Sequence, residues 1–505
     1  MAPPPFDPRR FPASGRAVAV ASGTLAVGVA ALAARRFGRS RVAVQRGRLA
    51  RTTSSARNAA LARMGGGTAA TYAAHRARRV FASAGRREEL DRSFELRTVE
   101  QVVDTLGHLK GALMKVGQLA SYLDQGMPDH IRDALAQLQA DAPPMSTELV
   151  DATIASELGE LPTALFDTWD PVPIAAASIG QVHRAITHDG RAVAVKVQYP
   201  GVDEAIGADL GSADTIFAGL AQLFPGLDPG PIVVELRERL LEELDYRLEA
   251  RNQAAFADHY RGHPTIHVPE VVPELSTARV LTTELVEGAT FAEMLTWSPE
   301  ERNLAAETIY RFAFGSLYGL GMFNGDPHPG NYLFGPGGRV SFLDFGLVKH
   351  FTPDEVEGFG RLIRAVVLDP DPARFRAEVE RLGVLRPGAP VSDEQVFDYF
   401  SHFYEFVRID GEYTISNEFA AATIRQMLDL GGPHGPVMRA VNVPPSFVVV
   451  QRINLGLYAI FGQIGATANW RRITEELWPF VQGPPSTPIG EAIAAWSARR
   501  ASRTD

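Results

Sequence analysis

The sequence predicts an α+β protein of two lobes, a small mixed lobe followed by a large helical one. Residues 175–185 and 192–197 are apolar or alternate in polarity around His188-Asp189-Gly190, as in a β-hairpin. From Ser298 onward the apolar spacing is mostly helical, apart from one loop and hairpin. The chain has 505 residues, 45% hydrophobic and 22% charged, and can bury a sizeable core.

Three helices are expected before the hairpin. Apolar residues recur at helical spacing over 98–125, and shorter helices are expected over 131–140 and 147–158. After the hairpin we expect a long helix over 231–259. Strand character returns at 268–272 and 279–285. The predicted domains are a basic arm (1–92), a helical extension (93–164), a small lobe (165–286), a large lobe (287–480) and a C-terminal tail (481–505).

Charge is distributed very unevenly along the chain. Residues 1–87 contain seventeen Arg, no Lys and one acid, Asp7, which gives a formal charge of +16. Because the whole chain carries −9, residues 88–505 carry −25. A basic arm on an acidic body suggests anionic lipid or nucleic acid as the arm's partner. The alternative is a disordered arginine-rich tail.

An uncharged apolar segment, residues 17–34, lies within this arm between Arg16 and Arg35-Arg36. As a helix its eighteen residues would span about 27 Å, just enough for the hydrocarbon core of a bilayer. Three interpretations remain open. The segment is a transmembrane or membrane-associated helix, a cleaved signal or organellar transit segment, or an alanine-rich helix away from membranes.

The chain contains no cysteine. This excludes a disulfide framework, a thiol nucleophile and any cysteine-based metal site.

Three side chains with oxygen ligands stand at a characteristic spacing. Asp326 precedes Asn331 by five residues, and Asp344, in Asp344-Phe345-Gly346, follows Asp326 by eighteen. Protein kinases place a catalytic-loop Asp, a metal-binding Asn and a second metal-binding Asp in this order. Oxygen ligands on two loops joined by a hairpin can hold Mg²⁺ against the phosphates of a nucleotide.

A lysine and three acids add to this pattern. Lys196 interrupts the apolar run 193–197, and in kinases such a Lys contacts the nucleotide phosphates and pairs with a helix Glu. Candidate partners on the following helix are Glu243, Asp245 and Glu249. The alternatives are a snorkelling edge Lys and a solvated acidic helix face.

Two further motifs lie upstream. Lys115 and Gln118 occupy adjacent positions on the helix expected over 98–125, with Gly117 between them. An alanine-rich loop stands where a kinase has its glycine-rich phosphate cover, and alanine restricts φ more than glycine does. The loop residues are Ala175, Ala176, Ala177, Ser178, Ile179, Gly180, Gln181 and Val182.

Taken in order, these motifs resemble the UbiB/AarF (ADCK-like) family of atypical kinases over about residues 95–480. The resemblance implies a two-lobed protein-kinase-like fold with the helical extension packed on the cleft. It implies ATP or ADP and Mg²⁺ as cofactors. By resemblance, Lys196 binds phosphate, Glu249 is its ion-pair partner, and Asp326 takes the catalytic-base position. Asn331 and Asp344 take the metal-ligand positions.

The resemblance also implies how the cleft is shaped. The alanine-rich loop covers the nucleotide, and the backbone of Glu284–Val286 forms the hinge that binds adenine. A polar cluster plugs the cleft where a conventional kinase takes its peptide; its members are Lys115, Gln118, Glu243 and Asp245. One departure concerns Asn324-Gly325, where family members often have His-Ala. We expect this pair to loosen the catalytic loop.

The segment after Asp344 argues against a conventional protein kinase. Thr352, Pro353 and Glu355 form a helix start with a capping box, which leaves no room for a long activation segment. We therefore expect an atypical kinase-like ATPase that acts on water or on a small or lipid-like molecule. The alternatives are an ATP-gated, non-catalytic scaffold for lipid-modifying enzymes and a small-molecule kinase, against which the plugging helix counts.

The resemblance implies a role in isoprenoid-quinone metabolism, with either ubiquinone or menaquinone, or in related lipid metabolism. The expected partners are a nucleotide, a membrane lipid or quinone precursor, and lipid-modifying enzymes, without a specific nucleic acid. We expect membrane association with the catalytic part on the cytoplasmic side, or at an organellar inner membrane in a eukaryote.

Overall fold

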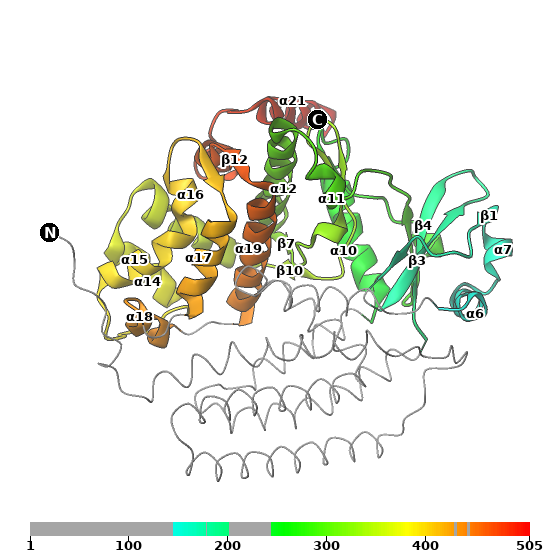
Figure 1. Cartoon of the computed structure of the whole chain (residues 1–505), viewed down its shortest axis with the longest axis horizontal. Helices are drawn as coiled ribbons and strands as arrows, with labels where there is room; N and C mark the ends of the chain where they lie inside the picture. The colour runs from blue at the N-terminus through cyan, green and yellow to red at the C-terminus, as the bar shows by residue number, and fades with distance from the viewer. Residues whose placement is uncertain (1–144, 178, 201–243, 429–431, 442–444, 505) are drawn as a thin grey trace, which may run out of the picture. The chain divides into compact units, whose positions relative to one another are not determined.

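A computed structural model describes residues 145–177, 179–200, 244–428, 432–441 and 445–504 (Figure 1). These residues belong to one compact unit. The basic arm and most of the helical extension lie outside the described residues, and so do Lys115, Gln118, Ser178 and Glu243.

The small lobe is an antiparallel sheet, as the sequence predicted. Its strands run in the order β1-β3-β4-β6, and β2 also pairs with β3. The predicted hairpin is the β3–β4 pair, and Gly190 in its turn has φ +85°, a conformation that favours glycine. The strands are β1 (Thr168–Trp169), β2 (Ala175–Ala176), β3 (Gly180–Ile186), β4 (Ala192–Gln198) and β6 (Val280–Glu284).

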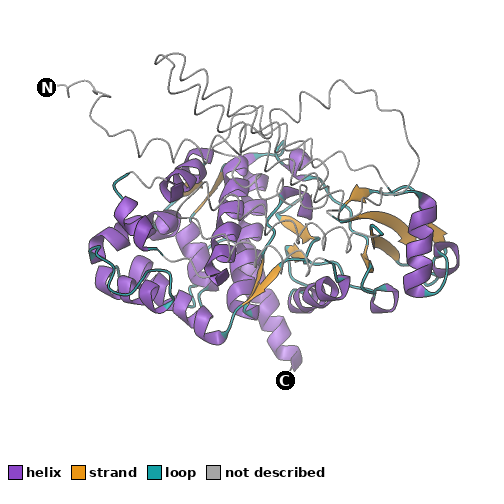
Figure 2. Ribbon diagram, turned by 90° about the horizontal axis from the view of Figure 1, so that it is seen from below, coloured by secondary structure: helices purple, strands orange, loops and turns teal. Residues whose placement is uncertain are grey.

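Two helices cover one face of this sheet, α6 (Thr147–Leu158) and α7 (Pro162–Leu165) (Figures 1 and 2). The bounds of α6 are those predicted. Val150 and Ile154 of α6 share a buried cluster with Val193, Val195 and Val197 of β4. Because side chains alternate across a strand, Lys196 lies on the opposite face of the sheet.

Helix α10 (Tyr246–His259) follows the sheet, and its start corrects one prediction. The helix expected over 231–259 is not continuous through Asp245, which is extended (φ −116°, ψ 95°). The Asp245 side chain accepts a hydrogen bond from Arg247 N, so it caps a new helix. Residues 231–243 lie outside the described residues.

The strand expected at 268–272 is also shifted. Strand β5 (Ile266–His267) ends before it, and only Val271 makes an isolated bridge, to Thr283. Pro269 and Pro273 lack the N–H groups that a longer ladder would need. Strand β5 instead pairs in parallel with β9 (Arg339–Phe342), which pairs with β8 (Tyr332–Gly335).

The large lobe is mostly helical, as predicted. Helix α12 (Pro299–Leu320) begins after the cap Ser298 and leads into β7 (Met322–Asn324), which pairs with β10 (Val348–His350). Between them lies η3 (Pro329–Asn331). The remaining elements are α11 (Phe291–Met294), α13 (Pro353–Ile363), α14 (Pro372–Arg381), α15 (Asp393–Ser401), α16 (Glu405–Arg408), β11 (Tyr413–Ile415), α17 (Asn417–Leu428), α18 (Gly435–Ala440), α19 (Pro445–Ile464), β12 (Ala466–Ala468), α20 (Trp470–Leu477) and α21 (Pro488–Thr504), with short turns at Pro273–Leu275, Arg364–Leu368 and His402–Tyr404.

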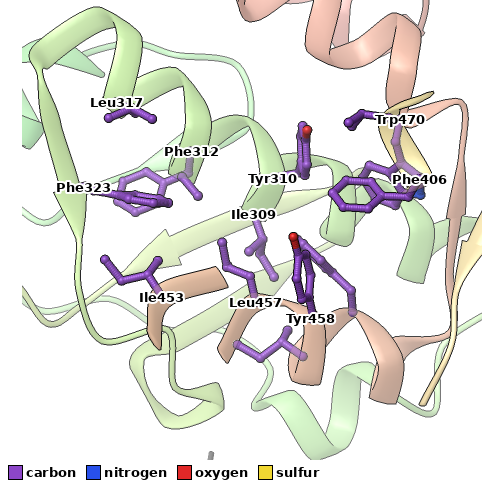
Figure 3. Close-up of a cluster of buried hydrophobic side chains, with 14 of the residues drawn as sticks. Ile309, Tyr310, Phe312, Leu317, Phe323, Phe406, Ile453, Leu457, Tyr458 and Trp470 are labelled. Atoms are coloured by element: carbon purple, nitrogen blue, oxygen red, sulfur yellow. The ribbon is translucent and has the colours of Figure 1, made fainter. Parts of the chain in front are cut away.

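The core of this lobe forms where α12 meets α19 (Figure 3). Ile309 and Tyr310 of α12 are fully buried, as are Ile453 and Leu457 of α19. Aromatic rings fill the space between the helices, with Tyr310 and Trp470 having ring centroids 5.1 Å apart. This packing holds α12, and with it the strand β7 that leads to the candidate site.

The predicted C-terminal tail contains a helix. Trp496 of α21 donates a hydrogen bond from its indole N–H to the carbonyl of Arg261, just after α10. The Arg500 guanidinium donates to the carbonyl of His259. The segment therefore packs against the end of α10. Among the helices that the structure describes, none is both long and apolar enough to span a bilayer; residues 17–34 lie outside them.

Candidate active site

Lys196 of β4 and Glu249 of α10 form a buried ion pair. Lys196 Nζ lies 2.8 Å from both carboxylate oxygens of Glu249. The two side chains are only 16% and 5% exposed. Below the ammonium lies the ring of Tyr246, 4.9 Å away at its centroid. Of the three acids predicted as partners, the structure thus brings Glu249 to Lys196.

Asp344 completes this charged group. Its Oδ2 lies 3.8 Å from Lys196 Nζ. Burial alone would lower the pKa of Lys196, but the carboxylates of Glu249 and Asp344 more than offset it, so the pKa is raised above its usual value. Lys196 therefore carries its charge throughout the physiological pH range.

The loop 325–331 holds the other two predicted polar residues together. Asn331 Nδ2 donates to the carbonyl of Asp326 at 3.1 Å and to its Oδ2 at 3.4 Å. His328, whose role the sequence left open, orders the loop, because its Nδ1 accepts from Gly330 N at 3.1 Å. Because Asn331 uses its amide N–H groups in these bonds, its amide oxygen is the atom of this side chain that can act as a ligand for a cation.

Asn324 joins this loop to the segment that carries Asp344. Its Nδ2 donates to the Asp344 carbonyl at 2.8 Å, and its Oδ1 accepts from Asp326 N at 3.2 Å. Gly325 fits closely, because a Cβ there would lie 2.8 Å from the Leu347 side chain. The Asn324 side chain ties both loops together, which argues against the expectation that Asn324-Gly325 loosens the catalytic loop.

A second polar side chain holds the Asp344 segment from the α10 side. Buried Asn252 donates from Nδ2 to the Phe345 carbonyl at 3.2 Å, and its Oδ1 lies 3.2 Å from His350 Nε2. Phe345 is fully buried against Phe256, with ring centroids 5.0 Å apart. Asp344 Oδ1 accepts from Gly346 N at 2.9 Å, which leaves Oδ2 toward Lys196.

The alanine-rich loop is only partly directed at the cleft. Ala175 and Ala176 are exposed, and Ala177 N donates to the Gly180 carbonyl at 2.8 Å in a tight turn. A Cβ at Gly180 would lie 2.3 Å from the Val197 carbonyl oxygen, so only glycine fits there. Val182 pairs with Lys196 and shares its face of the sheet.

Two predicted cofactor-binding side chains in this loop point elsewhere. Gln181 is buried on the face that α6 covers, where its Oε1 accepts from Met145 N at 2.7 Å and its Nε2 lies 2.9 Å from His183 Nε2. Ile179 is buried in the core. The alternation of β3 places Gln181 away from Lys196, so only its backbone can border the cleft.

The predicted hinge Glu284–Val286 lies at the end of β6. Glu284 N and Leu285 N are bonded to the carbonyls of Glu270 and Ala192. The N–H of Val286 has no backbone acceptor among the described residues. The Glu284 side chain turns away to His267, 3.2 Å from its Nε2. Adenine binding by this backbone stays a prediction, with Val286 N as the donor that has no backbone acceptor among the described residues.

The plugging cluster is not assembled by the described residues. Lys115, Gln118 and Glu243 lie outside them, and Asp245 is used as the cap of α10.

Sequence reasoning missed Tyr246 and Asn252, both of which bear on the site. They lie three residues before and three after Glu249, so all three share one face of α10. Their spacing of three residues on either side of Glu249, on one face of the helix, is the sequence signal that could have identified them.

The structure confirms the predicted helix start after Asp344. Thr352 Oγ1 accepts from Glu355 N, Glu355 Oε2 accepts from Thr352 N, and Pro353 is the first residue of α13. Six residues separate Gly346 from Pro353, and they include strand β10.

Comparisons with known proteins agree with this geometry. Residues 137–376 match the model of the ABC1 atypical kinase-like domain. The solved structure of Rv3197 from Mycobacterium tuberculosis, in complex with erythromycin, superposes with a TM-score of 0.58 at 33% identity. It covers 79% of this chain and 100% of that one. The chain belongs to the ABC1/UbiB (AarF domain) family of atypical kinases.

Other members are similar over shorter stretches. The chain is 30% identical to the atypical kinase COQ8, mitochondrial, of Saccharomyces cerevisiae over 57% of its own length and 58% of that protein. It is 34% identical to AarF domain-containing protein kinase 1 of Mus musculus over 51% of each. The chain thus spans about half the length of the curated relatives it matches.

Proposed function

We propose that this protein binds Mg-ATP between its lobes and acts as an atypical kinase-like ATPase or phosphotransferase. The observation that carries the proposal is the group formed by Lys196, Glu249 and Asp344. The Lys196 ammonium lies 2.8 Å from the buried Glu249 carboxylate and 3.8 Å from the Asp344 carboxylate. In this arrangement the ammonium can bind a phosphate while Asp344 binds a metal ion beside it.

Each side chain has a role in this proposal. Lys196, held in place by Glu249, neutralises phosphate charge. Asp326 orients the attacking water or hydroxyl, and Asn331 holds that carboxylate in place. Asn331 Oδ1 and Asp344 Oδ2 are the oxygen ligands for Mg²⁺, which binds proteins through few carboxylates and otherwise through phosphates and water. When bound, the metal would supply positive charge that offsets the charge of the nucleotide phosphates.

The acceptor we propose is water, or a small or lipid-like molecule. A conventional kinase docks its peptide on a long activation segment, whereas here six residues lead from Gly346 to the first residue of α13. The chain therefore has little surface at this position for an extended peptide.

The first test is Mg²⁺-dependent phosphate release from ATP, with and without anionic liposomes. We expect Asp344→Asn to lower it at least a hundredfold, because the variant removes the charge of a metal ligand. Asp258→Asn is the matched control, since Asp258 lies on α10 with its side chain 75% exposed. Equal phosphate release from wild type and Asp344→Asn would contradict the enzymatic function. Retained nucleotide binding without turnover in the wild type would instead support an ATP-gated scaffold.

We further propose that the protein works at a membrane in isoprenoid-quinone or related lipid metabolism. The support is the family membership, the +16 charge of residues 1–87 and the uncharged segment 17–34. Deleting residues 1–92 should abolish flotation with anionic liposomes and leave ATP hydrolysis without liposomes unchanged. Unchanged flotation would show that the arm is not the membrane-binding element.

A small-molecule ligand is the second candidate, favoured by the Rv3197 structure, whose ligand is erythromycin. Adding a macrolide to the hydrolysis assay distinguishes a small-molecule kinase from an ATPase. A phosphorylated macrolide in the products would favour a small-molecule kinase. Phosphate release without modified macrolide would favour the ATPase.

A further inference from the structure

A cavity of about 640 Å³ lies on the large lobe, away from the candidate active site. This volume lies in the range of small-molecule sites, which hold about 300–1,000 Å³. Its walls come from the end of α12, the start of α13 and the segment after α20. No residue assigned to nucleotide binding lines it.

Aromatic rings form much of its wall. Phe480 packs edge-to-face with Tyr318, at a centroid distance of 6.4 Å, and stacks on Trp478 at 5.7 Å. Its ring lies so close to α13 that a Cβ at Gly360 would approach it to 2.9 Å. Phe351 lines another side. The cavity therefore offers closely packed aromatic surface to an apolar chain.

Two cationic side chains lie over these aromatic rings. The Arg364 guanidinium lies 4.6 Å from the Phe480 ring centroid and donates to the Phe480 carbonyl at 3.2 Å. Lys349 Nζ lies 5.7 Å from the Phe351 ring centroid. Neither forms an ion pair with a carboxylate in the part of the chain that the structure describes. Arg364 lines the cavity, so its charge is available to an anionic group bound there, whereas Lys349 is not one of the lining residues.

The acid at the rim is already neutralised. Glu357 lies 2.6 Å from Arg361 Nη1, and Arg361 Nε contacts Glu378 at 3.1 Å. Arg381 contacts Glu378 in turn, at 2.8 Å. The charges of these four side chains balance, so Arg364 adds an uncompensated positive charge to the lining of the cavity.

Because the cavity walls are largely apolar and Arg364 supplies a cation, we propose that this cavity binds a single-chain amphipathic anion. Such a ligand is an alkyl or acyl chain that ends in a carboxylate or phosphate. The apolar chain lies against Phe351, Phe480 and Tyr318, and the head group meets Arg364.

The site adjoins the strands that carry the catalytic segments. Phe351 N donates to the Gly321 carbonyl at 2.8 Å, at one end of the β7–β10 ribbon. At its other end Val348 pairs with Asn324. Three residues of a strand span about 10 Å, so the bound ligand would be separated from Asn324 by the length of the β7–β10 strand pair.

The test is fluorescence titration of the full-length protein with cis-parinaric acid, a fluorescent single-chain carboxylate, followed by competition with decyl phosphate and with decanol. We expect saturable binding, with decyl phosphate competing at least tenfold better than decanol. Arg364→Gln should weaken cis-parinaric acid binding about tenfold, as expected for loss of one charge-assisted hydrogen bond.

Arg408→Gln is the matched control, because Arg408 also lies over an aromatic ring, Phe397, at 5.5 Å, but outside the cavity. Val356→Trp, which places a large ring in the cavity, should abolish binding while the melting temperature stays within a few degrees of wild type. Wild-type affinity in Arg364→Gln or in folded Val356→Trp would overturn the proposal, as would equal competition by decanol. None of these readouts depends on ATP hydrolysis, so the proposed enzymatic function can fail independently.

Discussion

The amide nitrogen of Asn252 lies 3.2 Å from the carbonyl oxygen of Phe345, which links helix α10 to the segment carrying Asp344. The same helix carries Glu249, one turn earlier, and so reaches both Lys196 and the Asp344 segment. Helix α10 therefore fixes the positions of Lys196 and Asp344, for which we propose roles in phosphate and metal binding, relative to each other.

Asn252→Leu should raise the KM for ATP about tenfold and cost about 1–3 kcal/mol in the free energy of unfolding, because it removes a buried hydrogen bond. Gln253→Leu is the control. Gln253 is equally buried and donates to the Pro269 carbonyl at 2.7 Å, away from the Asp344 segment. A similar stability loss with unchanged KM is expected there. Equal KM changes in both variants would refute the link through Asn252.

Lys196→Met should abolish ATP binding and cost about 3–5 kcal/mol in the free energy of unfolding. It removes the cation that both Glu249 oxygens accept from, and the carboxylate is only 5% exposed. The double variant Lys196→Met/Glu249→Met should recover most of that stability without recovering ATP binding. Denaturant unfolding and nucleotide titration measure the two effects. A double variant less stable than Lys196→Met would contradict the buried-pair argument.

His263 should make the protein sensitive to acid. Burial lowers its pKa from 6.5 to about 3, with smaller contributions from Arg311 and His259. The unfolded state therefore binds the proton first, and stability falls as the pH drops from 6.5 toward 3, by at most about 1.4 kcal/mol per pH unit.

His263 Nδ1 accepts from Ile266 N at 2.9 Å, and an Asn side chain offers an acceptor without a titrating group. Unfolding curves of His263→Asn should therefore depend less on pH between 6.5 and 4 than those of the wild type. Parallel curves would show that another group governs the acid sensitivity.

Much of the fold followed from the sequence because the signals were local. The caps of α13 and the exact bounds of α6 depend on residues within a few positions of each other. The start of α10 did not follow from the sequence. The Asp245 side chain accepts a hydrogen bond from Arg247 N, which competes with continuation of the helix, and the acidic segment 242–249 does not indicate this bond.

The candidate site was predictable in its members but not in their directions. The structure brings the five residues into two groups of contacts, one formed by Lys196, Glu249 and Asp344 and the other by Asp326 and Asn331. The side chain of Gln181 could not be placed, because its direction depends on the β3–β4 register. The hydrogen bonds of Asn324 cross from β7 to the Asp344 segment, twenty residues away, and no local pattern encodes them.

Asn324→Ala should lower kcat ten- to a hundredfold with a smaller change in KM. The variant frees the Asp344 carbonyl and Asp326 N from a shared side chain, and misplacement of catalytic groups by about 1 Å can cost a hundredfold. Asn324→His, which keeps a ring nitrogen to donate to the Asp344 carbonyl, should retain more activity than Ala. The control is Asn303→Ala, which loses one hydrogen bond from Thr467 N at 2.9 Å in the large lobe. If Asn324→Ala hydrolyses ATP as fast as Asn303→Ala, the bridge between the two loops is structural and has no part in positioning Asp326 against Asp344.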